Sequence, residues 1–332
     1  MKIASKLFII LAIVFFAGCS SKKVYEPKEV VGSWIVYGDS DEKIIDISSD
    51  TALLENRAVI SKEDRYFNIK IKDNYRVLGE SDGWIISADI DGNIILNGTD
   101  DEKKEKLFEL KKTVAGASVS GDMLALLFAD NEIALYSIST KELVFKEQGN
   151  PPLIVDSRIA NPYFMNDLVL FPTLDGKIII VNSEHKKRLR TIIVSSEEYF
   201  NNIIYFSIID NKLIAATGHK LFALAEKEIR ANYEVRTIVA DNNELFATTK
   251  QGELVALNLN LDMQRKLKFP FAHFLGMIIN DEKIYLLEKQ GYLIEVEKDF
   301  SSSKVYEVSV NDGFVFVADK LFYIDDTYVS VR

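Results

Sequence analysis

A short apolar hairpin recurs along this chain, and its recurrence constrains the fold more than any other feature. Its clearest copy is Leu245–Asn258, in which two apolar segments flank a polar turn with Gly252 at its tip. Glycine tolerates the positive φ of tight hairpin turns, and aliphatic and β-branched residues suit a pleated sheet. One hairpin of this kind is ordinary, so the information lies in the number and spacing of the copies.

Most of the chain aligns with this hairpin. Three further copies place a glycine at the turn, in Ile85–Leu96, Val169–Val181 and Ile284–Val296. A fourth begins at Leu124 and has Asn131 at the turn, as expected of a residue that also tolerates the left-handed region. Weaker copies with shortened turns are Ala52–Ile60, Leu213–Leu224 and Val315–Ile324.

The spacing of the hairpins predicts the architecture. They begin near residues 52, 85, 124, 169, 213, 245, 284 and 315, a mean interval of about 38 residues. Such a period, with only strands inside it, is typical of a β-propeller with four strands per blade. We therefore predict an all-β propeller of eight four-stranded blades, with seven blades as the alternative; a β-sandwich would not explain eight evenly spaced units. Third strands are expected at Leu143–Lys146, Arg188–Val194, Met263–Phe269 and Lys304–Val308.

Two further expectations follow from the repeat. Residues 101–112 are rich in Glu, Lys and Leu and favour helix by propensity, but the repeat predicts a strand at Lys106–Leu110. Both ends of the folded region, Val31–Tyr37 and Thr327–Arg332, are strand-like. We expect one terminus to complete a blade begun by the other and so to close the ring.

The N-terminus carries an export signal. Lys2 and Lys6 precede the apolar run Leu7–Ala17, which is too short to cross a hydrocarbon core of about 30 Å but suits a signal peptide. The run ends in Ala-Gly-Cys, which resembles the bacterial lipoprotein lipobox and predicts lipidation of Cys19. The predicted organisation is a signal peptide at 1–18, a lipidated tether at 19–30 and one propeller domain at 31–332. The alternative is a plain signal peptide with an incidental cysteine.

Composition excludes several functional classes. The formal net charge is −10, and removing residues 1–18 takes away two lysines and no acid. An acidic surface disfavours non-specific binding of nucleic acid, which needs clustered Lys and Arg. The single cysteine rules out an internal disulfide and any zinc site built from cysteines.

No catalytic, metal or cofactor site is predicted. The three histidines, His185, His219 and His273, lie in predicted turns or in an apolar connector. Asp89–Asn93 superficially resembles the start of a calcium loop, but its ligand spacing is incomplete and a plain hairpin turn is expected.

The repeats resemble those of pyrroloquinoline-quinone-type propellers. In that class a strand ending in Ala-Leu-Asp leads to Thr-Gly-Lys and then a Trp; here Lys141 stands at the Gly position and Phe145 at the Trp position, while Leu254–Asn258 matches the strand. The resemblance covers about residues 50–332, and the repeats there are degenerate members of that class. A lipid-anchored propeller of this class looks like the propeller lipoproteins of the outer-membrane β-barrel protein assembly machinery.

That resemblance implies a docking site in the connector Pro151–Pro162. The family carries an apolar pair and an Arg in this connector and uses them to dock the barrel-insertase partner. Val155 and Arg158 match those positions, with Leu153 and Ile154 as apolar neighbours, while Ser157 departs from the pattern. The alternative interpretation is an inter-blade strand at residues 153–155 with Arg158 as a solvated end residue.

We therefore expect a non-enzymatic scaffold, anchored by lipid to the outer membrane and facing the periplasm. By resemblance, its partners are the barrel-assembly complex and nascent outer-membrane client proteins. An envelope enzyme or a propeller that binds glycans or small molecules is the alternative, which a deep central pocket lined by carboxylates or aromatic residues would favour. A third possibility, a surface-exposed adhesin, depends on which leaflet holds the lipid.

Overall fold

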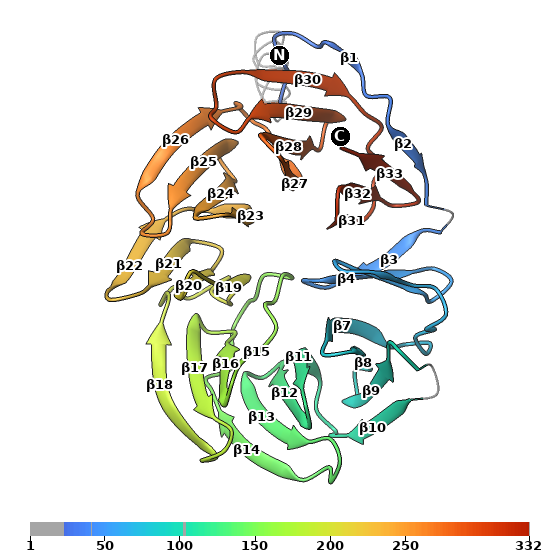
Figure 1. Ribbon diagram of the computed structural model, residues 1–332, viewed down its shortest axis with the longest axis vertical. Helices are drawn as coiled ribbons and strands as arrows, with labels where there is room; N and C mark the ends of the chain where they lie inside the picture. Colours follow the sequence, from blue (N-terminus) through green and yellow to red (C-terminus); the bar gives the residue numbers. More distant parts are fainter. Residues whose placement is uncertain (1–22, 41, 102–103, 332) are drawn as a thin grey trace, which may run out of the picture.

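The computed structural model describes residues 23–40, 42–101 and 104–331. In these ranges the chain forms eight antiparallel blades arranged in a ring, which Figure 1 views along the ring axis, and we call the region along that axis the channel. The described residues contain no α-helix, and hence no helix long and apolar enough to span a membrane. The prediction of an all-β propeller with eight blades is confirmed.

Each blade is numbered here in chain order, and its strands follow one another from the channel outward (Figure 1). Blades 1 to 4 consist of β3 (Ile44–Ile47), β4 (Thr51–Leu54), β5 (Val59–Ser61) and β6 (Arg65–Tyr66); β7 (Arg76–Ser81), β8 (Trp84–Ala88), β9 (Asn93–Gly98) and β10 (Glu105–Glu109); β11 (Val114–Ser120), β12 (Met123–Phe128), β13 (Glu132–Ser137) and β14 (Leu143–Gln148); and β15 (Tyr163–Met165), β16 (Leu168–Pro172), β17 (Lys177–Asn182) and β18 (Lys187–Ile193).

Blades 5 to 8 continue the pattern. They consist of β19 (Tyr205–Ile209), β20 (Lys212–Ala216), β21 (Lys220–Leu224) and β22 (Glu228–Asn232); β23 (Val235–Asp241), β24 (Glu244–Thr249), β25 (Glu253–Asn258) and β26 (Met263–Lys268); β27 (Phe274–Asn280), β28 (Lys283–Glu288), β29 (Tyr292–Glu297) and β30 (Ser303–Glu307), with β1 (Gly32–Ser33) added at the outer edge; and β31 (Val315–Ala318), β32 (Leu321–Ile324), β33 (Thr327–Ser330) and β2 (Tyr37–Asp39).

The recurrent hairpin is the middle pair of strands in seven blades. Its turn residues Gly92, Gly176, Gly252 and Gly291 have φ between 74° and 89°, and Asn131 has φ of 69°. In blade 8 the hairpin Val315–Ile324 is instead the inner pair, β31 and β32, so the sequence alignment of that copy is one strand out of register. The strand expected at Lys106–Leu110 is β10, because its pairing with β9 overrides local helix propensity.

The core is divided among the interfaces between blades. Eight apolar clusters occur in the described chain, each shared by two adjacent blades. Middle strands such as β12 and β16 are therefore buried on both faces and read as continuous apolar runs. Outer strands such as β18 are mostly exposed.

The two flat faces of the ring carry different loops. Where a blade ends, the first residue of the connector donates its amide to the middle-hairpin turn of the same blade, as Val194 does to Gly176 (2.9 Å) and Phe269 to Gly252 (2.8 Å). Connectors and middle turns thus share one face, which we name the connector face. The opposite face, with the turns between first and second and between third and fourth strands, is the hairpin face.

The termini close the ring, as predicted. In blade 8 the outer strand β2 comes from the N-terminus and pairs antiparallel with β33 from the C-terminus. Trp34 locks this junction, since its indole N–H donates to the Ser330 carbonyl (2.8 Å) and its ring packs edge-on to Tyr285 and Tyr306. β1 adds in parallel to β30 on blade 7.

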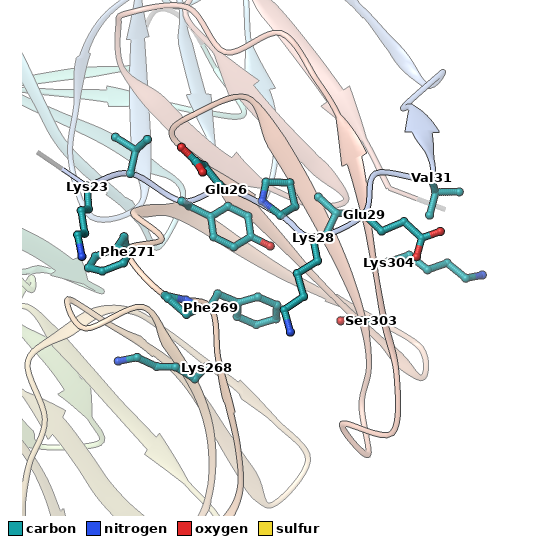
Figure 2. A pocket seen from close by; sticks show the side chains of 15 residues that line it. Lys23, Glu26, Lys28, Glu29, Val31, Lys268, Phe269, Phe271, Ser303 and Lys304 are labelled. Carbon is teal, nitrogen blue, oxygen red and sulfur yellow. The ribbon is translucent and has the colours of Figure 1, made fainter. Parts of the chain in front are cut away.

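Residues 23–31, which we name the strap, lie against blade 7 (Figure 2). The Tyr25 ring is buried and packs edge-on to Phe269 and Tyr292, and burial, followed by the charge of Glu288, raises its pKa to about 12. The part of the expected tether that is described therefore follows the surface of the propeller. The predicted signal peptide and Cys19 lie outside the described residues.

Candidate protein-binding surface

Residues 149–162, between β14 and β15, form the longest inter-blade connector in the described chain. The segment 153–155 is not a strand, so the connector is an irregular loop. Irregular loops on a rigid scaffold concentrate recognition, which makes this one the candidate site. Its two halves behave differently: the first half is exposed and the second half enters the channel.

Arg158 ties the connector to the far side of the ring. Its guanidinium donates to both carboxylate oxygens of Asp156 (2.9 and 2.5 Å) and to the carbonyl of Arg236 on β23 in blade 6 (2.5 Å). Burial disfavours the ionised Asp156 carboxylate, but the hydrogen bonds from Arg158 outweigh this effect and lower its pKa. Arg158 therefore makes its hydrogen bonds within the protein, while 37% of its side chain stays exposed.

Asn161 makes a second set of bonds across the channel. Its side-chain amide donates to the Leu78 carbonyl (3.0 Å) and the Ser49 hydroxyl (3.2 Å), and its oxygen accepts the Ala117 amide (3.3 Å). These partners belong to blades 1, 2 and 3. The second half of the connector thus crosses the channel and, through Arg158 and Asn161, joins three blades (1, 2 and 6) besides its own pair.

Bulges in the inner strands make these bonds possible. The ladders of β7, β11 and β23 shift register at Val77/Gly79, Val114/Gly116 and Val235/Thr237, beside the residues that meet Asn161 or Arg158. A bulge leaves one residue unpaired, so its backbone groups are free for the connector. A Cβ at Gly79 would lie 2.6 Å from the Asn161 amide nitrogen, so glycine is needed for this close approach.

The four residues predicted to bind a partner divide into two pairs. Leu153 is 69% exposed and Ile154 is 50% exposed. Val155 packs against the cluster between blades 3 and 4, and Arg158 makes the internal bonds described above. Of these four residues, Leu153 and Ile154 present exposed apolar side chains to a partner in this arrangement.

Two aromatic residues that the sequence did not single out extend this apolar surface. Tyr199 and Phe200, in the connector between blades 4 and 5, are 45% and 43% exposed. The Phe200 amide donates to the Ile154 carbonyl (2.9 Å), and Phe200 has φ of 51°, which is unusual for a bulky residue. We name Leu153, Ile154, Tyr199 and Phe200 the connector patch. The adjacent aromatic pair was the only signal available in the sequence.

Comparisons with known proteins place the chain near two groups. No family model matches it. Two curated relatives, both named plasminogen-binding protein PgbB, from Helicobacter pylori strains J99 and 26695, are 29% and 28% identical over 357 residues and match 93% of this chain. The chain spans 66% of the length of those relatives.

Solved structures share the fold. BamB from Moraxella catarrhalis superposes with a TM-score of 0.67 at 13% identity, over 89% of this chain and 98% of BamB. The C-terminal WD40 domain of Sif2 gives a TM-score of 0.62 at 11% identity, over 94% of this chain and 100% of that domain. The predicted resemblance to the assembly-machinery propeller is confirmed at the level of the fold.

Proposed function

We propose that this protein is a non-enzymatic scaffold that binds partner proteins through the connector patch. The observation that carries the proposal is the exposed Leu153–Ile154 pair, held on a loop whose second half is fixed in the channel. A rigidly held apolar patch loses little conformational freedom on binding, which favours its use as a docking surface.

Anchoring by a lipid on Cys19 to the periplasmic side of the outer membrane is part of the proposal. The Lys23 ammonium lies 5.4 Å from the ring centre of Phe271, which belongs to the connector between blades 6 and 7. Figure 2 shows the two side chains together at one end of the strap. The connector patch belongs to connectors as well, so both features lie on the connector face. Since four residues span at most about 14 Å, the anchor would hold that face near the membrane.

The proposed partners are the outer-membrane barrel-assembly complex and its client proteins. Support comes from the sequence resemblance and from the shared fold with BamB. A membrane-embedded partner fits a patch and an anchor that share one face.

Co-purification tests this proposal. The double variant Leu153→Ser/Ile154→Ser should lower recovery of barrel-assembly components about tenfold or more while leaving thermal stability unchanged, because both side chains are exposed. The matched control is Leu189→Ser/Met263→Ser, since these two residues are 50% and 54% exposed and lie toward the hairpin-face ends of the outer strands β18 and β26. Equal recovery with wild type and with the connector-patch variant would exclude the patch as the docking site.

Binding of plasminogen is a second candidate, favoured by the activity for which the two PgbB relatives are named, and those relatives match 93% of this chain. It would place the protein on the cell surface as an adhesin. Saturable binding of plasminogen to residues 20–332 immobilised on a sensor, with no recovery of barrel-assembly components from cells, would favour this candidate over the first.

A further inference from the structure

The central channel is closed at mid-depth and forms a cavity on the hairpin face. Asn161 lies across the channel at the level of the bulges in β7 and β11. On the hairpin-face side of Asn161 lies a cavity of about 550 Å³, bordered by blades 1 to 5. This volume is within the usual range for small-molecule sites, so a ligand has room to enter from the hairpin face.

One wall of the cavity holds a buried and poorly satisfied carboxylate. Asp50, in the turn between β3 and β4, accepts bonds from the hydroxyls of Ser48 (3.2 Å) and Ser49 (3.4 Å) and from the Glu80 amide (3.4 Å). Charge-assisted bonds are usually about 2.7–2.9 Å long, so all three contacts are weak. Burial raises the pKa of Asp50, and the charge of Lys62, followed by these three hydrogen bonds, only partly offsets that effect.

The charges lining the cavity are mainly negative. Among the described residues around it, the carboxylates of Asp50, Glu80 and Asp82 face one ammonium group, that of Lys62. Asp82 accepts the Gly121 amide (2.6 Å), and one oxygen of Glu80 accepts the Tyr66 hydroxyl, while the other Glu80 oxygen is buried without a hydrogen-bond partner among the described residues. Burial lowers the pKa of Lys62 and the charge of Asp50 partly offsets this effect, but no ion pair within 4 Å joins Lys62 to Asp50 among the described groups. A concave wall with excess negative charge attracts cations.

The opposite wall is aromatic. It is formed by Tyr163 and Phe164 of blade 4 and by Tyr205 and Phe206 of blade 5. The rings of Tyr163 and Phe206 are 5.6 Å apart and tilted by 51°. Such a wall can pack against an apolar or aromatic ligand body and attracts a cation near its ring faces.

We propose that this cavity binds a small primary amine with an apolar or aromatic body. The ammonium group pairs with Asp50, to which none of the described residues donates a short charge-assisted hydrogen bond, and the body packs on Tyr163 and Phe206. The site lies on the face opposite the connector patch. It is therefore independent of the proposed docking function and can be tested separately.

Titration with two probes of the same shape tests the site. The probes are 2-phenylethylamine and 2-phenylethanol, added to residues 20–332 and followed by calorimetry and by thermal shift. The amine should bind at least tenfold more tightly than the alcohol. Asp50→Asn should reduce its affinity to that of the alcohol, while Glu105→Gln, an exposed change on β10, should leave it unchanged.

Thermal unfolding of the variant separates loss of binding from loss of fold. Asp50→Asn removes a buried charge, so it should unfold at or above the wild-type temperature. If it unfolds at a lower temperature, Phe206→Leu serves as the second variant, because it removes the aromatic wall and keeps an apolar side chain. Equal affinity for amine and alcohol, or amine binding that survives both substitutions, would overturn the proposal.

Discussion

Single side chains in one connector hold the blades to one another across the channel. Arg158 and Asn161 bond to carbonyls that inner-strand bulges leave free, and Asp156 keeps Arg158 in place. The family resemblance assigns Arg158 to a partner, whereas here its donors are engaged by Asp156 and by β23. A partner-binding assay on an Arg158 variant would therefore mix two effects, because the substitution would also disturb the channel.

The first prediction concerns Asn161. Asn161→Ala should lower the free energy of unfolding by about 1–3 kcal/mol, because the Leu78 carbonyl and the Ala117 amide lose their partner inside the channel. Urea denaturation followed by fluorescence would measure the change. Asn260→Ala, at an exposed position in the turn after β25, should stay within about 0.5 kcal/mol of wild type. Equal stabilities for the two variants would refute a structural role for Asn161.

The second prediction concerns Asp156 and pH. Asp156→Asn should cost about 1–2 kcal/mol at neutral pH, a moderate loss because Arg158 is 37% exposed. The folded state lowers the pKa of Asp156, so its contribution is present above the ordinary value of about 3.9 and is lost as pH falls through the folded value. Denaturation at a series of pH values should show wild type and variant converging in acid. A constant difference would contradict this assignment.

At the scale of elements, the hairpin turn and the connector act as one unit. In blade 6 the Phe269 amide donates to the carbonyl of Gly252, and a Cβ on Gly252 would lie 2.3 Å from the Phe269 carbonyl oxygen. The glycine therefore serves two purposes, a positive φ in the turn and space for the connector that passes over it. The same glycine contact therefore fixes both the turn of the hairpin and the course of the connector that leads to the next blade.

The third prediction separates those two purposes. Gly252 (φ 74°) and Gly121 (φ 55°) both have left-handed backbones, but a Cβ on Gly121 would meet nothing within 4 Å. Gly121→Ala should cost about 1–2 kcal/mol of backbone strain, and Gly252→Ala should cost about 1–3 kcal/mol more because its methyl group collides with the connector. Thermal unfolding of both variants measures the difference. Equal losses would show that φ alone matters.

The parts of the fold that repeat were predictable, and the parts that occur once were not. The turn glycines and Asn131 sit in local patterns that fix both hairpin and period, so the blade count followed from the sequence. Blade 8 was aligned one strand out of register because its outer strand comes from the other end of the chain. The bonds of Arg158 and Asn161 across the channel join residues 44 to 112 positions apart, and no local pattern encodes such contacts.

For the candidate site, the sequence predicted which connector is involved, but not that its first half is exposed and its second half is bonded across the channel. Leu153 and Arg158 are only five positions apart, yet one points to solvent and the other is bonded across the channel. Tyr199 and Phe200 join the patch through a bond to Ile154 from a different connector. These relations depend on how consecutive blades turn about the axis, which the residues of one loop do not specify.

At the scale of the whole molecule, stability depends on a junction between the two ends of the chain. Blade 8 contains strands from both termini, and Trp34 packs between them and blade 7. Each blade is covered by its neighbours, so opening one interface exposes two apolar faces. The ring should therefore unfold cooperatively, beginning at this junction.

The fourth prediction tests the junction. Trp34→Ala should cost about 3–5 kcal/mol through lost packing. Trp34→Phe keeps much of that packing and loses the bond to the Ser330 carbonyl, so it should cost about 1–2 kcal/mol. Amide exchange in the alanine variant should rise first in β33 and β2. Uniform exchange around the ring would argue against a weak point at the junction.

The same junction also determines when, during synthesis of the chain, the ring can close. Trp34 and Ser330 are 296 positions apart, so the contact that completes the ring cannot form until almost the whole chain has been synthesised. Until then β2 has no partner, and the edge of a strand without a partner readily pairs with other chains. Loss of only the last few residues would leave such an edge permanently open. A nearly finished copy of this protein is thus more prone to aggregation than its length suggests.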